Sequence, residues 1–433
     1  MTPTSANPIS RRGLLTGSAG LATAAVLSGC VGATGESTPQ QTTTQAVSRD
    51  VVLQSNMQDE GPRKALAAVV EGNSDFDVTV NTVATSQFRA QLPTYLTSSQ
   101  APDVLTWYAG SVTNSFAKEG LLQDVSSVWQ SGNASKFSAA LKDLSTYEGA
   151  QYFVPTNYYW WALFHRKSAF EKWGVSAATT WDEFMGLLDN LKNKGVHPLT
   201  TGLANSAWMA AAWFDYLNLR VNGAGFHREL LAGKHSFDSD EVRAVMKHYA
   251  QILPYFHPNS LSWDPQQAAA PIARDEAAMY LVGTFATPYW PDDQQKDLDF
   301  FSVPTINPDI PSAEEAPTDG FIVAARGRNT AGGVAVADYL ASAKAQQEFI
   351  EKAVSPNLPT SPDVDTSTFS PLVQKGLKML NDTEQITQFF NRDSSDELQG
   401  TADDALMRFI NKPGDVDTIL ANWQQAAQQV FSQ

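Results

Sequence analysis

The chain has 433 residues, of which 30 are Lys or Arg and 46 are Asp or Glu, so its net charge at pH 7 is −16. This acidity argues against binding to nucleic acid, which needs basic residues to neutralise phosphates, and against attraction to anionic lipid. The length exceeds a single hydrophobic core and predicts two lobes. Because Cys30 is the only cysteine, the chain has no internal disulfide and no cluster of thiolates for a metal.

Residues 1–29 have the pattern of a bacterial export signal. Arg11 and Arg12 form its charged region, and residues 13–27 form a short, weakly apolar stretch. That stretch is too short, and too rich in Gly, Ser and Thr, to span a bilayer as a helix. The Arg pair also favours export by the twin-arginine route. Without this segment the protein is still more acidic, because the segment holds no Asp or Glu.

The signal ends in Leu-Ser-Gly before Cys30, which resembles the lipobox where a signal peptidase cleaves and the cysteine is lipid-modified. Residues 30–49 contain mainly Gly, Ser, Thr, Gln and Pro after the cysteine, a composition that predicts a flexible tether. We therefore expect an extracytoplasmic lipoprotein that is held at the cell membrane through Cys30.

Strand-like and helix-like segments alternate along the rest of the chain. Strands are predicted at residues 51–53, 77–80, 102–107 and 277–282. Helices are predicted at residues 62–71, 88–96, 184–191 and 242–249, and across most of 369–433 with a break at 412–414. Thr180 and Glu183 form a capping box that begins one of these helices. The alternation predicts an α/β fold with parallel sheets that helices cover on both faces.

Several segments carry a resemblance in their order and spacing. They are residues 102–108 (Pro-Asp-Val-Leu-Thr-Trp-Tyr), 116–122, 154–161 (Val-Pro-Thr-Asn-Tyr-Tyr-Trp-Trp), 164–167, 180–184, 213–218, 316–321 and 389–393 (Phe-Phe-Asn-Arg-Asp). Together they resemble the large extracellular solute-binding proteins of ABC sugar importers, the group that includes maltose-binding proteins. The resemblance implies a protein that binds a sugar or oligosaccharide and delivers it to ABC permease subunits. We expect it to act as a monomer.

The resemblance also implies a two-lobe periplasmic-binding-protein-like fold with a hinge of three chain crossings. We expect these crossings near residues 154–157, 318–321 and 358–362. The N-terminal lobe would then hold residues 50–155 and 320–360, and the C-terminal lobe residues 156–319 and 361–433. Closure of the hinge around the ligand is the expected motion.

A sugar site needs aromatic rings for the apolar faces of the sugar and polar side chains for its hydroxyl groups. Residues 158–161 are the best candidate platform. Along a strand, alternate residues face opposite sides, so Tyr158 and Trp160 share one face and Tyr159 and Trp161 share the other. We expect one pair to line the cleft and the other to pack inside a lobe; burial of all four is the alternative.

Two further aromatic residues, Trp107 and Tyr108, end a predicted strand, and ligands of open α/β sheets bind beyond the carboxyl ends of strands. Trp208, near the start of a helix, is a candidate platform, whereas Trp213 has the spacing of a core residue. Trp263 follows a loop and either covers the cleft or packs elsewhere.

Polar candidates lie in four places. Asp215 either accepts hydrogen bonds from sugar hydroxyl groups or only makes a hydrogen bond within its helix or carries a surface charge. The cluster after the first strand comprises Asp59, Glu60 and Arg63; its alternative role is a solvated helix start. Asp319 is either a ligand contact or a hinge anchor, and Gly320 beside it allows close approach of another backbone segment. Arg392 could reach the cleft, although an ion pair with Asp393 or Asp396 is the simpler expectation.

The motifs of several enzyme classes are missing from the sequence. It has no His pair with zinc-ligand spacing, no Gly-rich phosphate loop and no Gly-Xaa-Ser-Xaa-Gly motif. We therefore expect a binding protein without catalytic residues, metal or cofactor. Two alternatives stay open: a secreted glycan-active enzyme such as a glycosidase, which needs paired carboxyl groups, and a lipoprotein that senses a ligand without transporting it.

Overall fold

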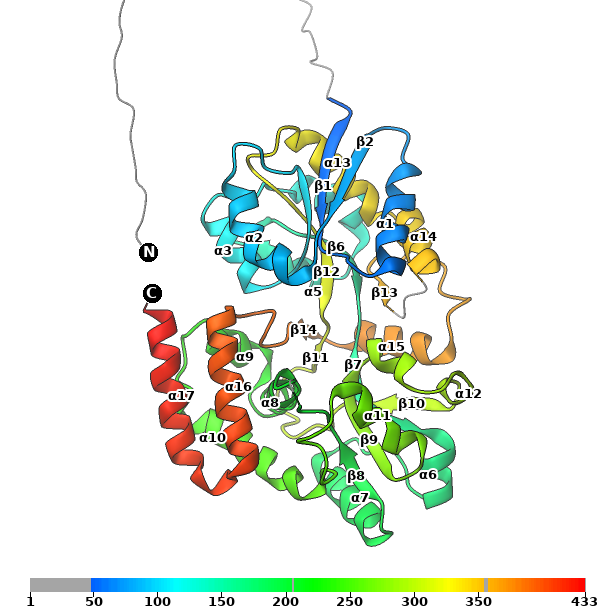
Figure 1. The fold of residues 1–433 in the computed structure, drawn as a ribbon, viewed down its shortest axis with the longest axis vertical. Helices are drawn as coiled ribbons and strands as arrows, with labels where there is room; N and C mark the ends of the chain where they lie inside the picture. The colour runs from blue at the N-terminus through cyan, green and yellow to red at the C-terminus, as the bar shows by residue number, and fades with distance from the viewer. Residues whose placement is uncertain (1–47, 205, 354–356, 433) are drawn as a thin grey trace, which may run out of the picture. The chain divides into compact units, whose positions relative to one another are not determined.

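A computed structural model of the protein describes residues 48–204, 206–353 and 357–432, so Cys30 and the export signal lie outside the described residues. Two β-sheets organise this part of the chain, and each forms one lobe with its helices (Figure 1). The first lobe has a six-stranded sheet in the order β13-β6-β12-β3-β1-β2. Its strands are β1 (Asp50–Ser55), β2 (Asp77–Thr82), β3 (Val104–Tyr108), β6 (Val154–Tyr158), β12 (Thr318–Val323) and β13 (Leu358–Pro359).

The helices of the first lobe pack around this sheet. They are α1 (Glu60–Glu71), α2 (Thr85–Thr97), α3 (Ser111–Lys118), α4 (Ser126–Gln130), α5 (Ala139–Leu144), α13 (Thr330–Ala341) and α14 (Ala343–Ala353), with the short hairpin β4 (Thr146–Tyr147) and β5 (Ala150–Gln151). The strands and helices predicted between residues 51 and 107 are confirmed at these places. Their apolar faces are buried, with Leu53, Phe88 and Val104 fully shielded from solvent.

The second lobe has a four-stranded sheet in the order β10-β7-β9-β8. Its strands are β7 (Trp161–Arg166), β8 (His197–Thr200), β9 (Ala277–Gly283) and β10 (Leu298–Phe301). Its helices are α6 (Lys167–Trp173), α7 (Trp181–Asn193), α8 (Trp208–Val221), α9 (Gly223–Leu231), α10 (Asp240–Ile252), α11 (Pro265–Ala273), α12 (Asp292–Gln295), α15 (Pro371–Asp382), α16 (Asp396–Asn411) and α17 (Val416–Phe431). A two-stranded sheet of β11 (Ala313–Glu315) and β14 (Gln385–Thr387) lies beside α8.

The expected α/β architecture is confirmed, but the expectation of parallel sheets is correct only in part. β1 runs parallel to β2 and β3, and β8 runs parallel to β9. β12 is antiparallel to β3 and β6, and β7 is antiparallel to β9 and β10. For β12 the reason is that the chain leaves the first sheet after β6 and returns to it only with β12, so no helical crossover within that sheet joins these two strands.

The three predicted crossing segments fall on β6, β12 and β13, which are neighbours in the first sheet. β6 ends at Tyr158 and the second sheet begins at Trp161. Gly320 lies where β12 pairs with β6, and a Cβ atom at this position would come within 2.2 Å of the carbonyl oxygen of Val154. Glycine is therefore required there, since any side chain would push the two strands apart.

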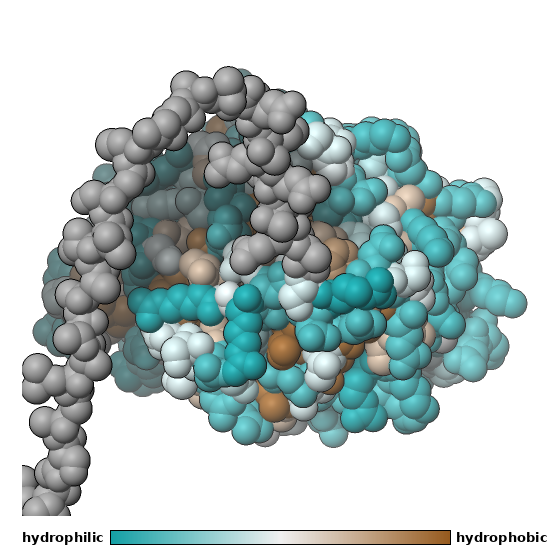
Figure 2. Space-filling view, turned by 90° about the horizontal axis from the view of Figure 1, so that it is seen from above, coloured by the Kyte–Doolittle hydropathy of each residue, from teal (hydrophilic) through white to brown (hydrophobic). Residues whose placement is uncertain are grey.

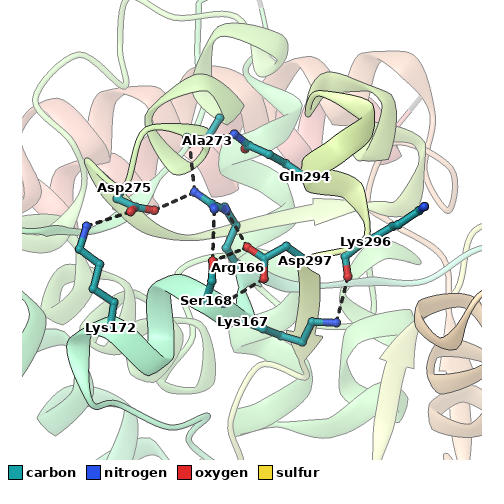
Figure 3. A network of polar contacts seen from close by, with 9 residues as sticks. All are labelled: Arg166, Lys167, Ser168, Lys172, Ala273, Asp275, Gln294, Lys296 and Asp297. Atoms are coloured by element: carbon teal, nitrogen blue, oxygen red, sulfur yellow. Dashed lines mark hydrogen bonds and ion pairs between the residues drawn. The ribbon is translucent and has the colours of Figure 1, made fainter.

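Local signals in the second lobe also hold. Thr180 and Glu183 form the predicted capping box at the start of α7, and Pro413–Asp415 form a short 3₁₀ helix that separates α16 from α17. At the end of β7, Arg166 donates to Asp297 at 2.9 Å and to Asp275 at 2.8 Å (Figure 3). These contacts tie β7 to the segments that precede β9 and β10.

Hydrophilic residues cover most of the face drawn in Figure 2, as the acidic composition leads one to expect. Among the helices that the structure describes, none combines the length and the apolar character needed to cross a membrane.

Candidate functional site

A cavity of about 280 Å³ opens between residues of the β6–β7 junction, helix α8, the segment after β9 and the segment between β14 and α16. Six aromatic residues and four others line it: Tyr159, Trp161, Trp208, Phe285, Phe389 and Phe390, with Ala211, Asp215, Asn391 and Arg392. This volume is near the lower end of the range of roughly 300–1,000 Å³ found for small-molecule sites. The combination of aromatic walls and a few polar groups suits a small ligand with both apolar and polar faces.

Trp161 is the centre of the aromatic wall. Its ring lies 4.5 Å from that of Phe389, 5.6 Å from that of Phe285 and 5.8 Å from that of Trp208, measured between centroids. The indole Nε1 of Trp161 is buried without a hydrogen-bond partner in the described structure. Gly283 makes this packing possible, because a Cβ atom there would lie 2.7 Å from that nitrogen and 2.6 Å from the Phe285 ring.

Asp215 brings a carboxyl group to the cavity from helix α8. Its side chain is fully buried, and Oδ2 accepts a hydrogen bond of 2.9 Å from the backbone N–H of Phe390. The other oxygen, Oδ1, has no partner among the described residues. Burial raises the pKa of Asp215 well above its usual range, and the carboxyl group of Asp393 raises it further. A polar ligand group would satisfy Oδ1.

Arg392 brings a guanidinium group to the same cavity. Its Nη1 donates to Oδ1 of Asp319 at 2.8 Å, and its Cζ lies 5.2 Å from the ring centre of Tyr108 and 5.7 Å from that of Tyr159. Burial by itself lowers the pKa of Arg392, but the Asp319 carboxylate, together with Tyr159 and Tyr108, raises it above its usual value. This arrangement keeps the guanidinium charged and fixed in direction.

The expected pairing of Arg392 with Asp393 or Asp396 is therefore wrong. Asp393 instead accepts a hydrogen bond from the backbone N–H of Ser111, and Asp396 forms an ion pair with Arg89. Both of these contacts join the segment after β14 to helices of the first lobe, which leaves Arg392 free to turn toward Asp319.

The structure brings three of the predicted site residues into the cavity, namely Trp161, Trp208 and Asp215. Two more, Asp319 and Tyr108, contact Arg392 and so belong to its surroundings. Of the pairs in residues 158–161, the one that lines the cavity is Tyr159 with Trp161. Gly320 has the backbone role described above.

Tyr158 and Trp160 lie outside the cavity, and the geometry does not favour the ligand role predicted for them. Trp160 is fully buried, with its ring 5.5 Å from that of Phe300. A Cβ atom at Gly376 would lie 2.6 Å from the Trp160 ring, so the indole fills the space against α15. Tyr158 is buried as the last residue of β6. The backbone between the two strands turns the other pair toward the cavity.

The remaining candidates also lie away from the cavity. Trp107 stacks on Phe88 and Tyr108 and lines a separate groove between α2 and α3 of the first lobe and α9, α16 and α17 of the second. Trp263 stacks on His257 at 4.3 Å. Asp59, Glu60 and Arg63 are exposed around the start of α1, where Glu60 pairs with Lys64. A ligand role for these residues stays a prediction.

Several lining residues were not singled out from the sequence. Phe389, Phe390 and Asn391 occur in a segment that carried the resemblance, but no periodicity marks them as facing a cavity. Phe285 lies two residues after the end of the buried strand β9, so the rule that ligands bind beyond strand ends would have found it.

Two α/β lobes with an aromatic and polar cavity define the class of two-lobe solute-binding proteins. Residues 56–347 match the model of the family of bacterial extracellular solute-binding proteins, and the chain belongs to this family. An uncharacterized ABC transporter extracellular-binding protein of Pyrococcus horikoshii is 22% identical over 373 residues, which are 83% of this chain and 82% of that protein. A probable sugar-binding periplasmic protein of Mesorhizobium japonicum is 29% identical over 177 residues, 40% of this chain and 42% of that protein.

Among solved structures, the bacterial solute receptor AcbH superposes with a TM-score of 0.83 at 27% identity, covering 88% of this chain and 99% of that one. AcbH is described as having an exclusive substrate preference for β-D-galactopyranose. A probable secreted solute-binding lipoprotein of Streptomyces coelicolor has the same fold, with a TM-score of 0.73 at 14% identity and coverage of 88% and 99%.

Proposed function

We propose that this protein binds a sugar in the aromatic cavity and delivers it to the permease of an ABC importer. The observation that carries the proposal is the combination, in one cavity, of an aromatic wall around Trp161 with the unpartnered Oδ1 of Asp215 and the fixed guanidinium of Arg392. The wall packs on the apolar face of a sugar ring, and the two polar groups accept from and donate to its hydroxyl groups. Each neutral hydrogen bond contributes roughly 0.5–1.5 kcal/mol, so several must act together.

We further propose that the protein binds without catalysis and acts at the outer side of the membrane, anchored through Cys30. A glycosidase needs two carboxyl groups that face the substrate. Of the residues that line the described cavity, Asp215 is the one carboxylic acid. Membership of an extracellular binding-protein family supports the location.

Isothermal titration calorimetry with a panel of sugars tests the proposal, beginning with D-galactose because of the likeness to AcbH. We expect at least one sugar to bind, and Trp161→Ala to weaken its affinity by about 30-fold, the effect of removing an anchor worth roughly 2 kcal/mol. Trp181→Ala is the control, since Trp181 is also buried but donates to Gln251 outside the cavity. Release of reducing ends from a glycan, or equal loss of affinity in both variants, would contradict the proposal.

A further inference from the structure

Behind the cavity wall at Asp215 lie further buried carboxylic acids, which outnumber the charged basic groups available to pair with them. Glu315 on β11 is fully buried, and Asp393 is 6% exposed. Helix α8 packs against β11, and one turn beyond Asp215 the side chain of Asn218 contacts His227, whose Nε2 is 3.8 Å from Oε1 of Glu315. These contacts place Glu315 behind the face of α8 that carries Asp215.

The basic side chains near Asp215 and Glu315 either pair with other groups or are uncharged. Arg220 pairs with Glu314 at 2.5 Å, and Arg228 donates to the carbonyl oxygen of Ile386 and lies 3.5 Å from Asp143. Burial lowers the pKa of His227 to about 4, so its imidazole is neutral at pH 7.

Arg392 enters the cavity but is paired with Asp319. No ion pair of Asp215 occurs among the described residues. An ionised carboxylate without a partner in a dry interior is strongly unfavourable. The carboxyl groups respond by holding protons: burial raises the pKa of Asp215 and of Glu315, and the Asp215 charge adds to the effect on Glu315.

We propose that the ligand of this cavity is a sugar that carries a protonated amino group, which donates to Oδ1 of Asp215 while aromatic rings cover the faces of the sugar. The inference rests on the proposed function and names the chemical class of the ligand. An ammonium group beside a carboxylate and above aromatic rings is stabilised both by the opposite charge and by the negative ring faces. A neutral sugar supplies only hydroxyl groups and brings no positive charge to Asp215.

When the amino sugar binds, its ammonium group replaces the positive charge of a proton that the buried carboxyl groups held. The ammonium group keeps its protons and donates one hydrogen bond to Asp215. The proton that Asp215 and Glu315 held between them passes to solvent. Affinity for the amino sugar therefore rises with pH up to the point where the amine itself loses its proton, whereas affinity for the neutral parent changes less. Protonation of Asp215 at low pH removes the charge that attracts the amine.

The test compares matched ligands by calorimetry: D-galactosamine, D-galactose and N-acetyl-D-galactosamine, then the three glucose counterparts. We expect the amine to bind at least about tenfold more tightly than its neutral parent and its neutral acetyl derivative at pH 7. Asp215→Asn should remove this preference, and Glu315→Gln should reduce it. Asp403→Asn is the control, because burial also raises the pKa of Asp403 but this residue lies on α16 and lines no part of the cavity.

Circular dichroism checks that each variant is folded, and Glu315→Gln keeps the test decisive if Asp215→Asn does not fold. Equal or tighter binding of a neutral parent sugar overturns the amino-sugar inference and leaves the proposed function standing. So does a preference for the amine that survives both substitutions. If no sugar of either series binds, the proposed function fails and the inference fails with it.

Discussion

Nη1 of Arg392 lies 2.8 Å from Oδ1 of Asp319, although 73 residues separate them in the chain. Asp319 belongs to β12 of the first sheet, and Arg392 follows β14 beside the second lobe. The side chains of Arg392 and Asp319 are 20% and 30% exposed, so solvent weakens the pair only in part. The contact joins β12 to the cavity wall.

Replacing Arg392 by Lys should weaken sugar binding by about tenfold. A planar guanidinium can donate to Asp319 and to the ligand from different nitrogen atoms, whereas an ammonium group lacks this geometry. The free energy of unfolding should fall by about 1 kcal/mol. Arg408→Lys is a matched control, since Arg408 pairs with Asp404 on an exposed face of α16. Calorimetry and urea unfolding measure both quantities, and an unchanged affinity would show that Arg392 has no part in the site.

Replacing Gly320 by Ala should destabilise the protein by about 1–3 kcal/mol or more, since the new Cβ would lie 2.2 Å from the carbonyl oxygen of Val154. Gly400→Ala should have the opposite effect on stability. No atom lies within 4 Å of a Cβ at Gly400 in α16, so alanine should stabilise that helix by roughly 0.5–1 kcal/mol. Urea midpoints measure both changes, and equal midpoints would contradict the packing described for β12 and β6.

The contact between Asp393 and Ser111 offers a test of coupling between the lobes. Asp393 Oδ1 accepts from the backbone N–H of Ser111 at 2.5 Å, and the Ser111 hydroxyl donates to the carbonyl oxygen of Asp393. Asp393→Ala should cost about 1–3 kcal/mol of stability, because it leaves a partly buried N–H without a partner. It should also weaken sugar binding, since residues 389–392 line the cavity.

The control for that prediction is Asp396→Asn, which removes a largely exposed pair with Arg89 and should change stability by less than about 1 kcal/mol. If Asp393→Ala lowers stability but leaves calorimetric affinity at the wild-type value, the segment after β14 does not transmit strain to the cavity.

The buried Glu315 predicts a specific dependence of stability on pH. Burial and the charge of Asp215 raise the pKa of Glu315 in the folded state above its value in the unfolded chain. The folded state thus holds a proton that the unfolded state has lost, and stability falls as pH rises from the unfolded pKa, about 4.3, through the folded one. Glu315→Gln should therefore raise the melting temperature more at pH 7 than at pH 4. An equal shift at both pH values would contradict the raised pKa.

The predicted lipid anchor can be tested in cells. Cys30→Ala should give a protein that is either unprocessed or released, because the cleavage and acylation need the thiol. Labelling with a radioactive fatty acid and fractionation of membranes measure the outcome, with wild type as the reference. A variant that is still acylated and membrane-bound would show that Cys30 is not the anchor.

Local sequence patterns determined much of the secondary structure. The capping box at Thr180 and the break at residues 412–414 depend on neighbours in the chain, and the structure has both. Alternation along residues 158–161 grouped Tyr159 with Trp161, and both line the cavity, although Tyr159 and Trp160 lie in the junction between β6 and β7 and not in one continuous strand. It could not say which pair faces the cavity, since that depends on what packs against each face.

Only the tertiary structure decided the composition of the site. Trp161, Phe285 and Phe389 meet in one wall although more than 200 residues separate the first from the last. The antiparallel course of β7 and the burial of Trp160 against α15 likewise depend on elements far away in the chain. The acid surplus behind Asp215 has the same origin: a carboxyl group is ordinary in sequence, and its pKa changes only when folding removes water and brings a second carboxyl group near it.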